Sequence, residues 1–242
     1  MESHILSLVI WVPIFAGLAV LAIGDRQPQA ARVLALIGAL AGLLVALPLW
    51  TRFDRGVADF QFMELTPWID SFHVNYHLGI DGMSLLLILL NCITTVLVVI
   101  AGWEVIQKRV AQYMAAFLMM SGLMNGVFSA LDGMLFYVFF EATLIPMYIV
   151  IGIWGGQNRV YAAMKFFLYT LLGSLLMLVA FLYLFNKSGG SFEILDWHKL
   201  PLAMPAQLTL FAAFFLAFSV KVPMWPVHTL SLIHISEPTR PY

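Results

Sequence analysis

Long apolar stretches constrain the fold of this chain more than any other feature. Because the hydrocarbon core of a bilayer is about 30 Å thick, a helix that crosses it needs about 20 predominantly apolar residues. The sequence contains seven stretches of this kind, at residues 5–23, 33–50, 83–103, 113–131, 134–154, 161–185 and 206–221. It therefore predicts an all-α, polytopic transmembrane helix bundle.

The composition agrees with a membrane protein and argues against several functional classes. Hydrophobic residues make up 62% of the chain, charged residues only 10%, and the mean hydropathy is +0.93. Charged residues make up about 25% of a soluble domain. With a formal net charge of −1 and no run of basic residues, the sequence offers nothing for nucleic acid.

The chain also carries no residue pattern for a redox cofactor. Its single cysteine, Cys92, cannot form a disulfide within the chain or hold an iron-sulfur cluster by itself. No phosphate-binding or dinucleotide-binding fingerprint occurs. We therefore expect no cofactor and no metal in this chain, and we assign any redox chemistry to partner proteins.

The charges in the connections predict an orientation. No basic region precedes the first apolar stretch and no small-residue cleavage site follows it, so we expect a retained helix rather than a signal peptide. Lys and Arg concentrate in the loops after the first, third and fifth stretches, and such loops stay in the cytoplasm. These basic residues are Arg26, Arg32, Lys108, Arg109 and Arg159. The amino terminus is then expected on the outer side.

The outer loop at residues 51–82 contains a strand signal. Apolar residues from Phe72 to Ile80 alternate with polar ones at the period of two that is typical of a strand. We expect a short strand or hairpin that docks a neighbouring protein. A metal site at His73 and His77 is the weaker alternative, because two histidines without further ligands are a weak signal.

Glu141 is the first candidate for chemistry, because an ionisable residue inside a membrane span is a functional candidate by default. On a helix it shares its face with Tyr137 and Tyr148. Pro146 lacks the amide that would bond to the carbonyl of Ala142, so the helix should be loosened beside the acid. Low dielectric favours the neutral acid and a nearby cation favours the carboxylate, so protonation can follow the movement of a lysine. The alternative is a structural Glu141 that holds helices together.

Lys221 is the second candidate. It ends the last apolar stretch and is followed by Pro223 and Pro226, which cannot continue a regular helix. Broken helices at membrane depth mark ion sites in transporters. Lysine can alternate between charged and neutral forms, whereas arginine cannot. The alternative is a lysine that extends to the membrane surface.

Two further residues are candidates for the proton path. Lys165 lies about one turn inside the sixth stretch, where extension to the surface competes with a role in proton transfer. His228 follows the prolines and titrates near physiological pH, although a lone histidine is equally often structural. Asn91, Met119, Met120 and Met124 are expected to be packing residues rather than ligands.

Four ordered blocks of the sequence resemble a known family. They are HLGIDGMSLLLILL from His77, FFEATLIPMYIVIGIWGG from Phe139, AMKFFLYTLLGSLLML from Ala163 and FLAFSVKVPMWPVH from Phe215. They are similar to chain M of bacterial NADH-quinone oxidoreductase, respiratory complex I. Members of that family are proton-translocating, antiporter-like membrane subunits, and the resemblance implies the same role here.

The resemblance implies a fold and a set of roles. The fold is the opening part of an antiporter-like inverted repeat with a broken helix at Lys221. Glu141 and Lys221 match a charge pair on the proton path of the family, and Lys165 and His228 match polar positions near that path. Flavin, iron-sulfur clusters and quinone belong to other subunits. The resemblance also implies other complex I membrane subunits as partners, no direct contact with NADH, and a multi-pass location in the bacterial inner membrane.

The resemblance further divides the chain. Residues 1–110 are expected to form the first three helices with the outer loop at 51–82, and residues 111–228 the start of the antiporter-like domain. Residues 229–242 are interpreted as a tail foreign to the family, because Ser231 to Tyr242 reads SLIHISEPTRPY where the family continues with further helices. We therefore expect an amino-terminal fragment.

The sequence is compatible with three functions. The first is a membrane subunit that translocates protons through a Glu/Lys relay, coupled to electron transfer from NADH to quinone, with no redox catalysis in this chain. The second is a subunit of a multi-subunit cation/proton antiporter. The third is a structural membrane scaffold in which Glu141 and Lys221 only hold helices together.

Overall fold

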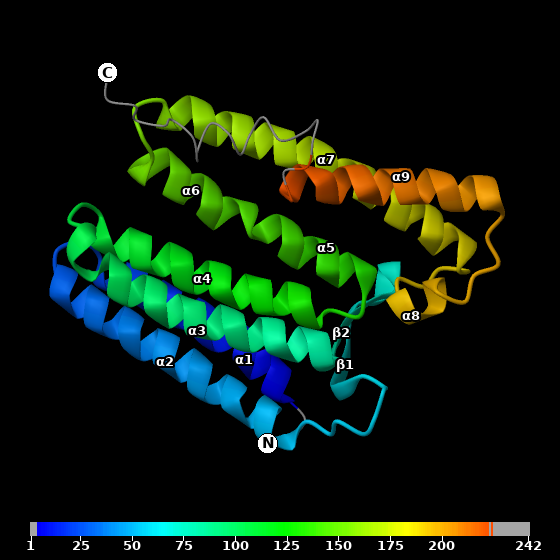
Figure 1. Ribbon diagram of the computed structural model, residues 1–242, viewed down its shortest axis with the longest axis horizontal. Coiled ribbons are helices and arrows are strands. Elements are labelled where there is room, and N and C mark those ends of the chain that lie inside the picture. Colours follow the sequence, from blue (N-terminus) through cyan, green and yellow to red (C-terminus); the bar gives the residue numbers. More distant parts are fainter. Residues whose placement is uncertain (1–3, 223, 225–242) are drawn as a thin grey trace. The chain divides into compact units, whose positions relative to one another are not determined.

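The computed structural model describes residues 4–222 and 224 (Figure 1). In this part of the chain, seven helical segments are long and apolar enough to cross a membrane. They are α1 (Ile5–Ile23), α2 (Pro28–Arg52), α3 (Gly82–Val105), α4 (Val110–Ser129), α5 (Gly133–Ala142) with α6 (Leu144–Trp154), α7 (Arg159–Lys187) and α9 (Met204–Lys221). The predicted all-α membrane class is confirmed. Pro223, Pro226, His228 and residues 229–242 lie outside the described residues.

The chain divides into two compact units, one up to Met147 and one from Tyr148 onward, and each is described by itself. In the first unit, α1 to α4 pack closely through small residues. A Cβ atom at Gly17 of α1 would lie 2.8 Å from Cγ of Met119, and one at Gly122 of α4 would meet the carbonyl oxygen of Ile10. Such residues let helix backbones approach, which is how helices associate where lipid provides no hydrophobic driving force.

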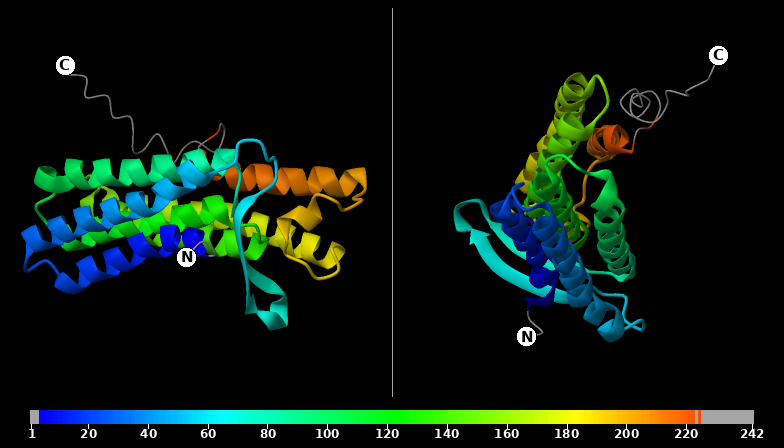
Figure 2. Two further views of the ribbon diagram at one scale, coloured as in Figure 1. Left: turned by 90° about the horizontal axis from the view of Figure 1, so that it is seen from below. Right: turned by 90° about the vertical axis from the view of Figure 1, so that its left-hand side faces the viewer.

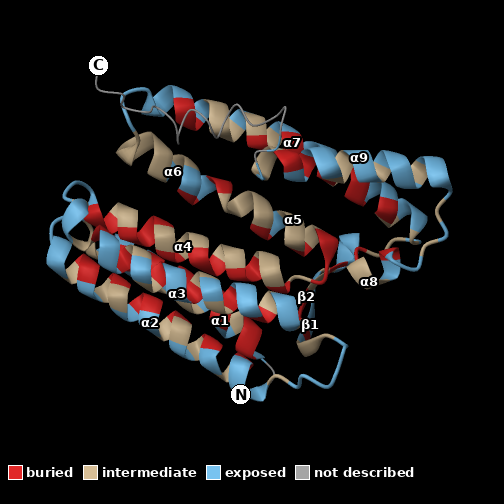
Figure 3. Ribbon diagram, viewed as in Figure 1, coloured by how far each residue is buried: buried red, intermediate tan, exposed pale blue. Residues whose placement is uncertain are grey.

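The outward faces of this helix bundle remain apolar. Figure 3 shows buried positions on the facing sides of the helices and exposed positions on their outer sides. Phe15, Leu44 and Leu90 are each at least 60% exposed. A helix that is hydrophobic all round belongs in a membrane or in a large core, so these faces are suited to lipid or to neighbouring subunits.

A β-hairpin occupies the connection between α2 and α3. Strand β1 (Gln61–Ile69) pairs with the antiparallel strand β2 (Val74–Ile80), and the register places Glu64 opposite Leu78. The hairpin lies at the end of the unit where α1 begins (Figure 2). The expected hairpin is thus confirmed.

The expected alternation of polar and apolar faces along β2 is wrong. His77 and Gly79 were placed on the polar face, yet both are buried, as are Leu78 and Ile80. The cause is the link between α4 and α5, which covers the second face of the strand. Leu78 forms an isolated bridge with Ala130, and a Cβ atom at Gly79 would lie 2.6 Å from Cδ1 of Leu131.

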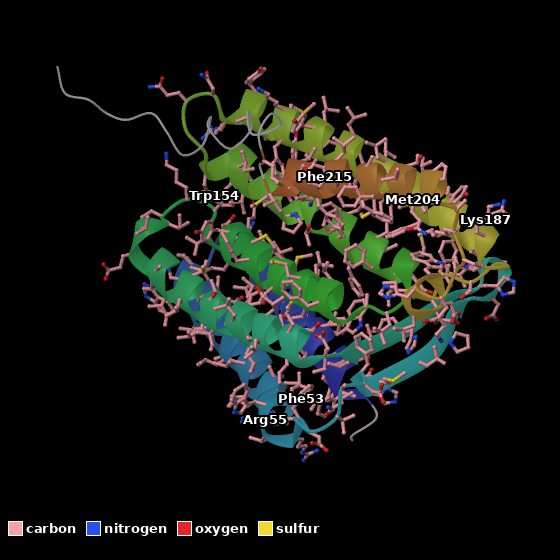
Figure 4. All side chains as sticks on the ribbon, turned by 45° about the vertical axis from the view of Figure 1, so that its right-hand side comes forward. Phe53, Arg55, Trp154, Lys187, Met204 and Phe215 are labelled. Atoms are coloured by element: carbon pink, nitrogen blue, oxygen red, sulfur yellow. The ribbon has the colours of Figure 1, made fainter. Side chains whose placement is uncertain are left out.

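The second unit contains α7 and α9, joined through the short helix α8 (Ile194–Trp197), which the sequence did not predict. Aromatic rings pack in this connection: Phe181 lies 5.1 Å from Trp197, and Phe185 lies 4.3 Å from Phe192, between ring centroids. Figure 4 labels Lys187 at the end of α7 and Met204 at the start of α9. The two helices therefore run antiparallel.

Candidate functional site

Glu141 lies in the last turn of α5. The residue is partly buried, and its Oε1 atom is shielded from solvent by the rest of the chain. Two residues earlier, Phe139 packs directly on α4, because a Cβ atom at Gly126 would lie 2.7 Å from the Phe139 ring. A glycine and an aromatic ring thus fix the distance between α5 and α4 beside the acid.

The start of α5 is fixed by Asp132, which is fully buried. Its Oδ1 atom accepts hydrogen bonds from the backbone N–H groups of Met134 (2.9 Å) and Leu135 (3.0 Å), and its Oδ2 atom accepts one from the N–H of Asn75 at 3.1 Å. One carboxylate therefore caps α5 and ties it to β2. This role was not predicted from the sequence, although an Asp directly before an apolar helix is a common N-cap signal.

The helix that carries Glu141 is interrupted two residues later. The single helix predicted over 134–154 is divided at Thr143 into α5 and α6. Thr143 donates from its N–H to the carbonyl of Phe139 at 3.2 Å and from its Oγ1 to the carbonyl of Phe140 at 2.7 Å. Pro146, in the first turn of α6, lacks an N–H for the preceding turn. The predicted loosening of the helix beside the acid is confirmed.

Of the two phenols expected on the Glu141 face, Tyr148 is engaged with α7. Its hydroxyl donates to Sδ of Met164 at 3.4 Å, and its ring lies 5.8 Å from the ring of Phe167. Tyr148 belongs to the second unit.

Lys221 is the last residue of α9 and is partly buried. The preceding residue, Val220, packs against α7, where a Cβ atom at Gly173 would lie 3.0 Å from its Cγ2 atom. After Lys221 the chain turns, with the N–H of Val222 bonded to the carbonyl of Phe218 at 2.9 Å. The helix therefore ends at the predicted place, and the prolines that were expected to break it lie outside the described residues.

Lys165 lies on α7, eight residues before Gly173, which corresponds to about 12 Å along the helix. Because α9 runs antiparallel to α7 and ends at Lys221, the two lysines lie toward the same end of this helix pair. The second unit therefore contains Lys165 and Lys221 together, and Glu141 belongs to the first unit.

The sequence did not predict three buried hydroxyls on α7 and α9, the helices that carry these lysines. Thr170, Ser174 and Ser219 are each at most 3% exposed. Each donates to a carbonyl of its own helix, with Thr170 bonded to Phe166 at 2.6 Å and Ser219 to Phe215 at 2.5 Å. A hydroxyl can donate and accept, so it can continue a chain of proton transfers. The only sequence signal was a small polar residue within an apolar stretch.

A separate polar network joins α1, α3 and α4. Asn91 donates to the carbonyl of Ser121 at 2.9 Å and to Oδ1 of Asn125 at 2.8 Å, and Asn125 donates to the carbonyl of Val9 at 3.1 Å. Asn91, which was expected to be a packing residue, thus joins α3 to α4 through hydrogen bonds. Met120 and Met124 line a groove of about 270 Å³ between α3 and α4.

The histidines of the hairpin occupy different environments. His73 is exposed, in a left-handed conformation with φ of 52°, whereas His77 is buried on β2. Within residues 4–222 and 224, no group of three or more His, Cys, Asp or Glu side chains is arranged to hold a metal ion.

Comparison with known proteins covers nearly the whole chain. The family model described as NADH:quinone oxidoreductase/Mrp antiporter, TM, matches residues 130–239, and the model described as NADH-ubiquinone oxidoreductase chain 4, amino terminus, matches residues 56–128. NADH-quinone oxidoreductase subunit M of Rhodobacter capsulatus is 43% identical over 98% of this chain and 49% of that protein. The chain thus spans about half the length of the curated relatives it matches.

Solved structures share the fold. A chain of the respiratory complex I from Thermus thermophilus with bound NADH matches 95% of this chain and 46% of its own length, at 31% identity and a TM-score of 0.79. A chain of the Mrp complex from Dietzia matches 92% of this chain and 24% of its own length, with the same TM-score and 15% identity, which shows the fold alone. On these matches, the chain belongs to the family of antiporter-like membrane subunits that includes subunit M of NADH-quinone oxidoreductase.

Proposed function

We propose that this chain is part of a membrane subunit that translocates protons, coupled to electron transfer from NADH to quinone in a respiratory complex I. The observation that carries the proposal is the position of Glu141, an acid with a shielded oxygen two residues before a helix interruption. This acid lies in a chain that is 43% identical to a subunit M of NADH-quinone oxidoreductase. A titratable group with a shielded oxygen on a loosened helix has both the chemistry and the freedom that proton transfer requires.

The proposed relay uses the opposite responses of an acid and a lysine to low dielectric. Glu141 stays neutral when no cation is near and gives up its proton when a positive charge approaches. Lys221 is charged when solvated or paired and releases its proton when its surroundings become apolar. Lys165 and His228 pass protons between this pair and water. The hydroxyls of Thr170 and Ser219 extend the path.

The proposal places the redox chemistry in other subunits. Flavin, iron-sulfur clusters and quinone are held there, and this chain makes no direct contact with NADH. Its partners are the neighbouring membrane subunits and the lipid of the bacterial inner membrane, which the apolar outer faces of α1 to α4 are suited to contact. The β-hairpin serves to dock one of these neighbours.

The test measures proton uptake per NADH oxidised in inverted membrane vesicles from the organism that carries the gene. The variant is Glu141→Gln and the matched control is Glu104→Gln, which removes the same charge at the exposed end of α3. Electron-transfer rate and subunit abundance are matched between samples. We expect a lower proton yield for Glu141→Gln only. An unchanged yield would remove Glu141 from the relay and favour the scaffold function.

The same vesicles separate complex I from a cation/proton antiporter. An antiporter subunit exchanges protons when a Na⁺ or K⁺ gradient is imposed, without NADH. The proposed subunit moves protons only during NADH oxidation. Gradient-driven proton exchange that disappears in Glu141→Gln and persists without NADH would contradict the proposed coupling.

A further inference from the structure

A buried cation without a counter-charge lies near the start of α2. Arg32 is 6% exposed, and its Nη2 atom donates to the carbonyl of Ile106 at 2.9 Å and to Oε1 of Gln107 at 3.4 Å. Its Nε atom is shielded from solvent and makes no hydrogen bond to any of residues 4–222 and 224. Within that same part of the chain, no carboxylate forms an ion pair with Arg32.

This arrangement is electrostatically incomplete. The guanidinium group stays charged at every physiological pH, so it cannot relieve burial by losing a proton. A buried charge is retained when an opposite charge compensates it. The two neutral oxygens that accept from Nη2 leave the net positive charge in place. An anion from outside the described chain would complete the site.

The elements around Arg32 supply further positive charge. The link between α1 and α2 and the link between α3 and α4 lie at the same end of the first unit (Figure 1). They are joined where Oδ1 of Asp25 accepts from the N–H of Ala111 at 2.9 Å. The basic residues of these two links and the adjoining helix turns are Arg26, Arg32, Lys108 and Arg109, and the acidic residues are Asp25 and Glu104. The balance is four cations against two carboxylates, one of which already caps α4.

The surface next to this basic cluster is apolar. On α2, Val33 is 48% exposed and Ile37 is 56% exposed; on α3, Ile100 is 52% exposed and Val105 is 78% exposed. These helices are long and apolar enough to cross a membrane, so their exposed faces are suited to lipid chains. A cationic cluster at the end of membrane-crossing helices, bordered by apolar surface, matches the two parts of an anionic phospholipid.

We propose that Arg32 and the basic cluster of Arg26, Lys108 and Arg109 bind the headgroup phosphate of an anionic phospholipid, whose acyl chains lie on α2 and α3. The bound phosphate neutralises the Arg32 guanidinium and holds the two links together. An acidic side chain of a neighbouring protein would supply the same charge, but it would not cover the exposed apolar residues on α2 and α3. The site is independent of the proposed proton path.

The test uses the protein purified in its native membrane assembly and placed in vesicles that contain photoreactive phosphatidylglycerol or photoreactive phosphatidylcholine. After illumination, lipid attached to peptides from 28–40 and 96–109 is quantified by mass spectrometry. The variants are Arg32→Gln and the rim variant Arg26→Gln with Lys108→Gln, which leaves the buried residue in place. The control is Arg55→Gln, which removes the same charge beyond the opposite end of α2.

We expect these peptides to be labelled more strongly by phosphatidylglycerol than by phosphatidylcholine. Arg32→Gln should lower the phosphatidylglycerol label to the phosphatidylcholine level, the rim variant should reduce it, and the control should leave it unchanged. Equal labelling by both lipids would overturn the proposal. So would suppression by inorganic phosphate, which would indicate a free-anion site. An Arg32→Gln variant labelled as strongly as the wild type would also overturn it, as expected if a neighbouring acidic side chain supplies the charge.

Discussion

Glu64 of strand β1 accepts a hydrogen bond of 2.7 Å from the backbone N–H of Leu6 in the first turn of α1. The same oxygen accepts from the N–H of Ser7 at 3.3 Å, and the other oxygen accepts from the Ser7 hydroxyl at 2.5 Å. His4, at the N-cap position, makes no side-chain capping bond. A residue 58 positions away therefore caps the helix, and its negative charge meets the positive end of the helix dipole.

Glu64→Ala should therefore loosen the start of α1 from the hairpin. Glu64 is 5% exposed, and its loss leaves the backbone N–H groups of Leu6 and Ser7 without their acceptor. We therefore expect the free energy of unfolding to fall by about 1–3 kcal/mol. The check is hydrogen exchange at the amides of Leu6 and Ser7, which should become faster. The exposed residue Glu104 changed to Ala is the control, and equal exchange in both variants would contradict the capping role.

Tyr76 next to this cap predicts a loss of stability at alkaline pH. Its hydroxyl is bonded to Ser7 Oγ at 3.1 Å and Trp11 Nε1 at 3.2 Å, and burial raises its pKa above the usual 10.0. A raised pKa means that the folded protein binds the proton more tightly than the unfolded chain. The contribution is complete below pH 10.0 and is lost as the pH rises through the raised value.

The measurement is the melting temperature as a function of pH, for the wild type and for Tyr76→Phe. The wild type should lose stability above pH 10.0 by more than the variant, because the variant has no phenol to ionise. Identical pH profiles would show that Tyr76 does not contribute.

Gly126→Val tests how α5 is positioned. The new side chain would overlap the Phe139 ring, which lies 2.7 Å from the position of a Cβ atom at Gly126. Overpacking of this kind costs about 1–3 kcal/mol. We expect a lower free energy of unfolding and a lower proton yield, since Phe139 lies two residues before Glu141. Gly156→Ala, where nothing lies within 4 Å, should change neither quantity.

Gly173→Leu tests the packing that sets the end of α9. A larger residue there would push against Val220, the neighbour of Lys221. We expect reduced proton translocation with an unchanged NADH oxidation rate, because the lysine is displaced without being altered. Val220→Ala in the same chain should restore part of the loss, as expected for residues in direct contact. Failure of this second change to restore any function would argue against the contact as the cause.

The sequence predicted the membrane-crossing helices well, because length and apolarity are local properties that burial in a bilayer requires. The predicted stretch was shorter than the observed helix at α2, which begins at Pro28 rather than at residue 33. The sequence also predicted the loosened helix near Glu141. Pro146 has no backbone N–H, and this removes a hydrogen bond within the same helix, so the effect is local.

The parts that the sequence did not predict depend on distant contacts. The Glu64 cap joins residues 58 positions apart, and the burial of His77 depends on a link that begins at Ala130. The absence of a counter-charge for Arg32 among the described residues can be recognised only when its bond to the carbonyl of Ile106 and its shielded Nε atom are both known. No local pattern encodes any of these three relationships.

In the proposed relay, Glu141 changes its protonation state while the protein works. Infrared difference spectra between the resting and the NADH-driven states detect a protonated carboxyl group directly through its C=O stretch. We expect a carboxyl band in the wild type that is absent from Glu141→Gln and present in Glu104→Gln. A carboxyl band that remains unchanged in Glu141→Gln, or no such band in the wild type, would contradict it.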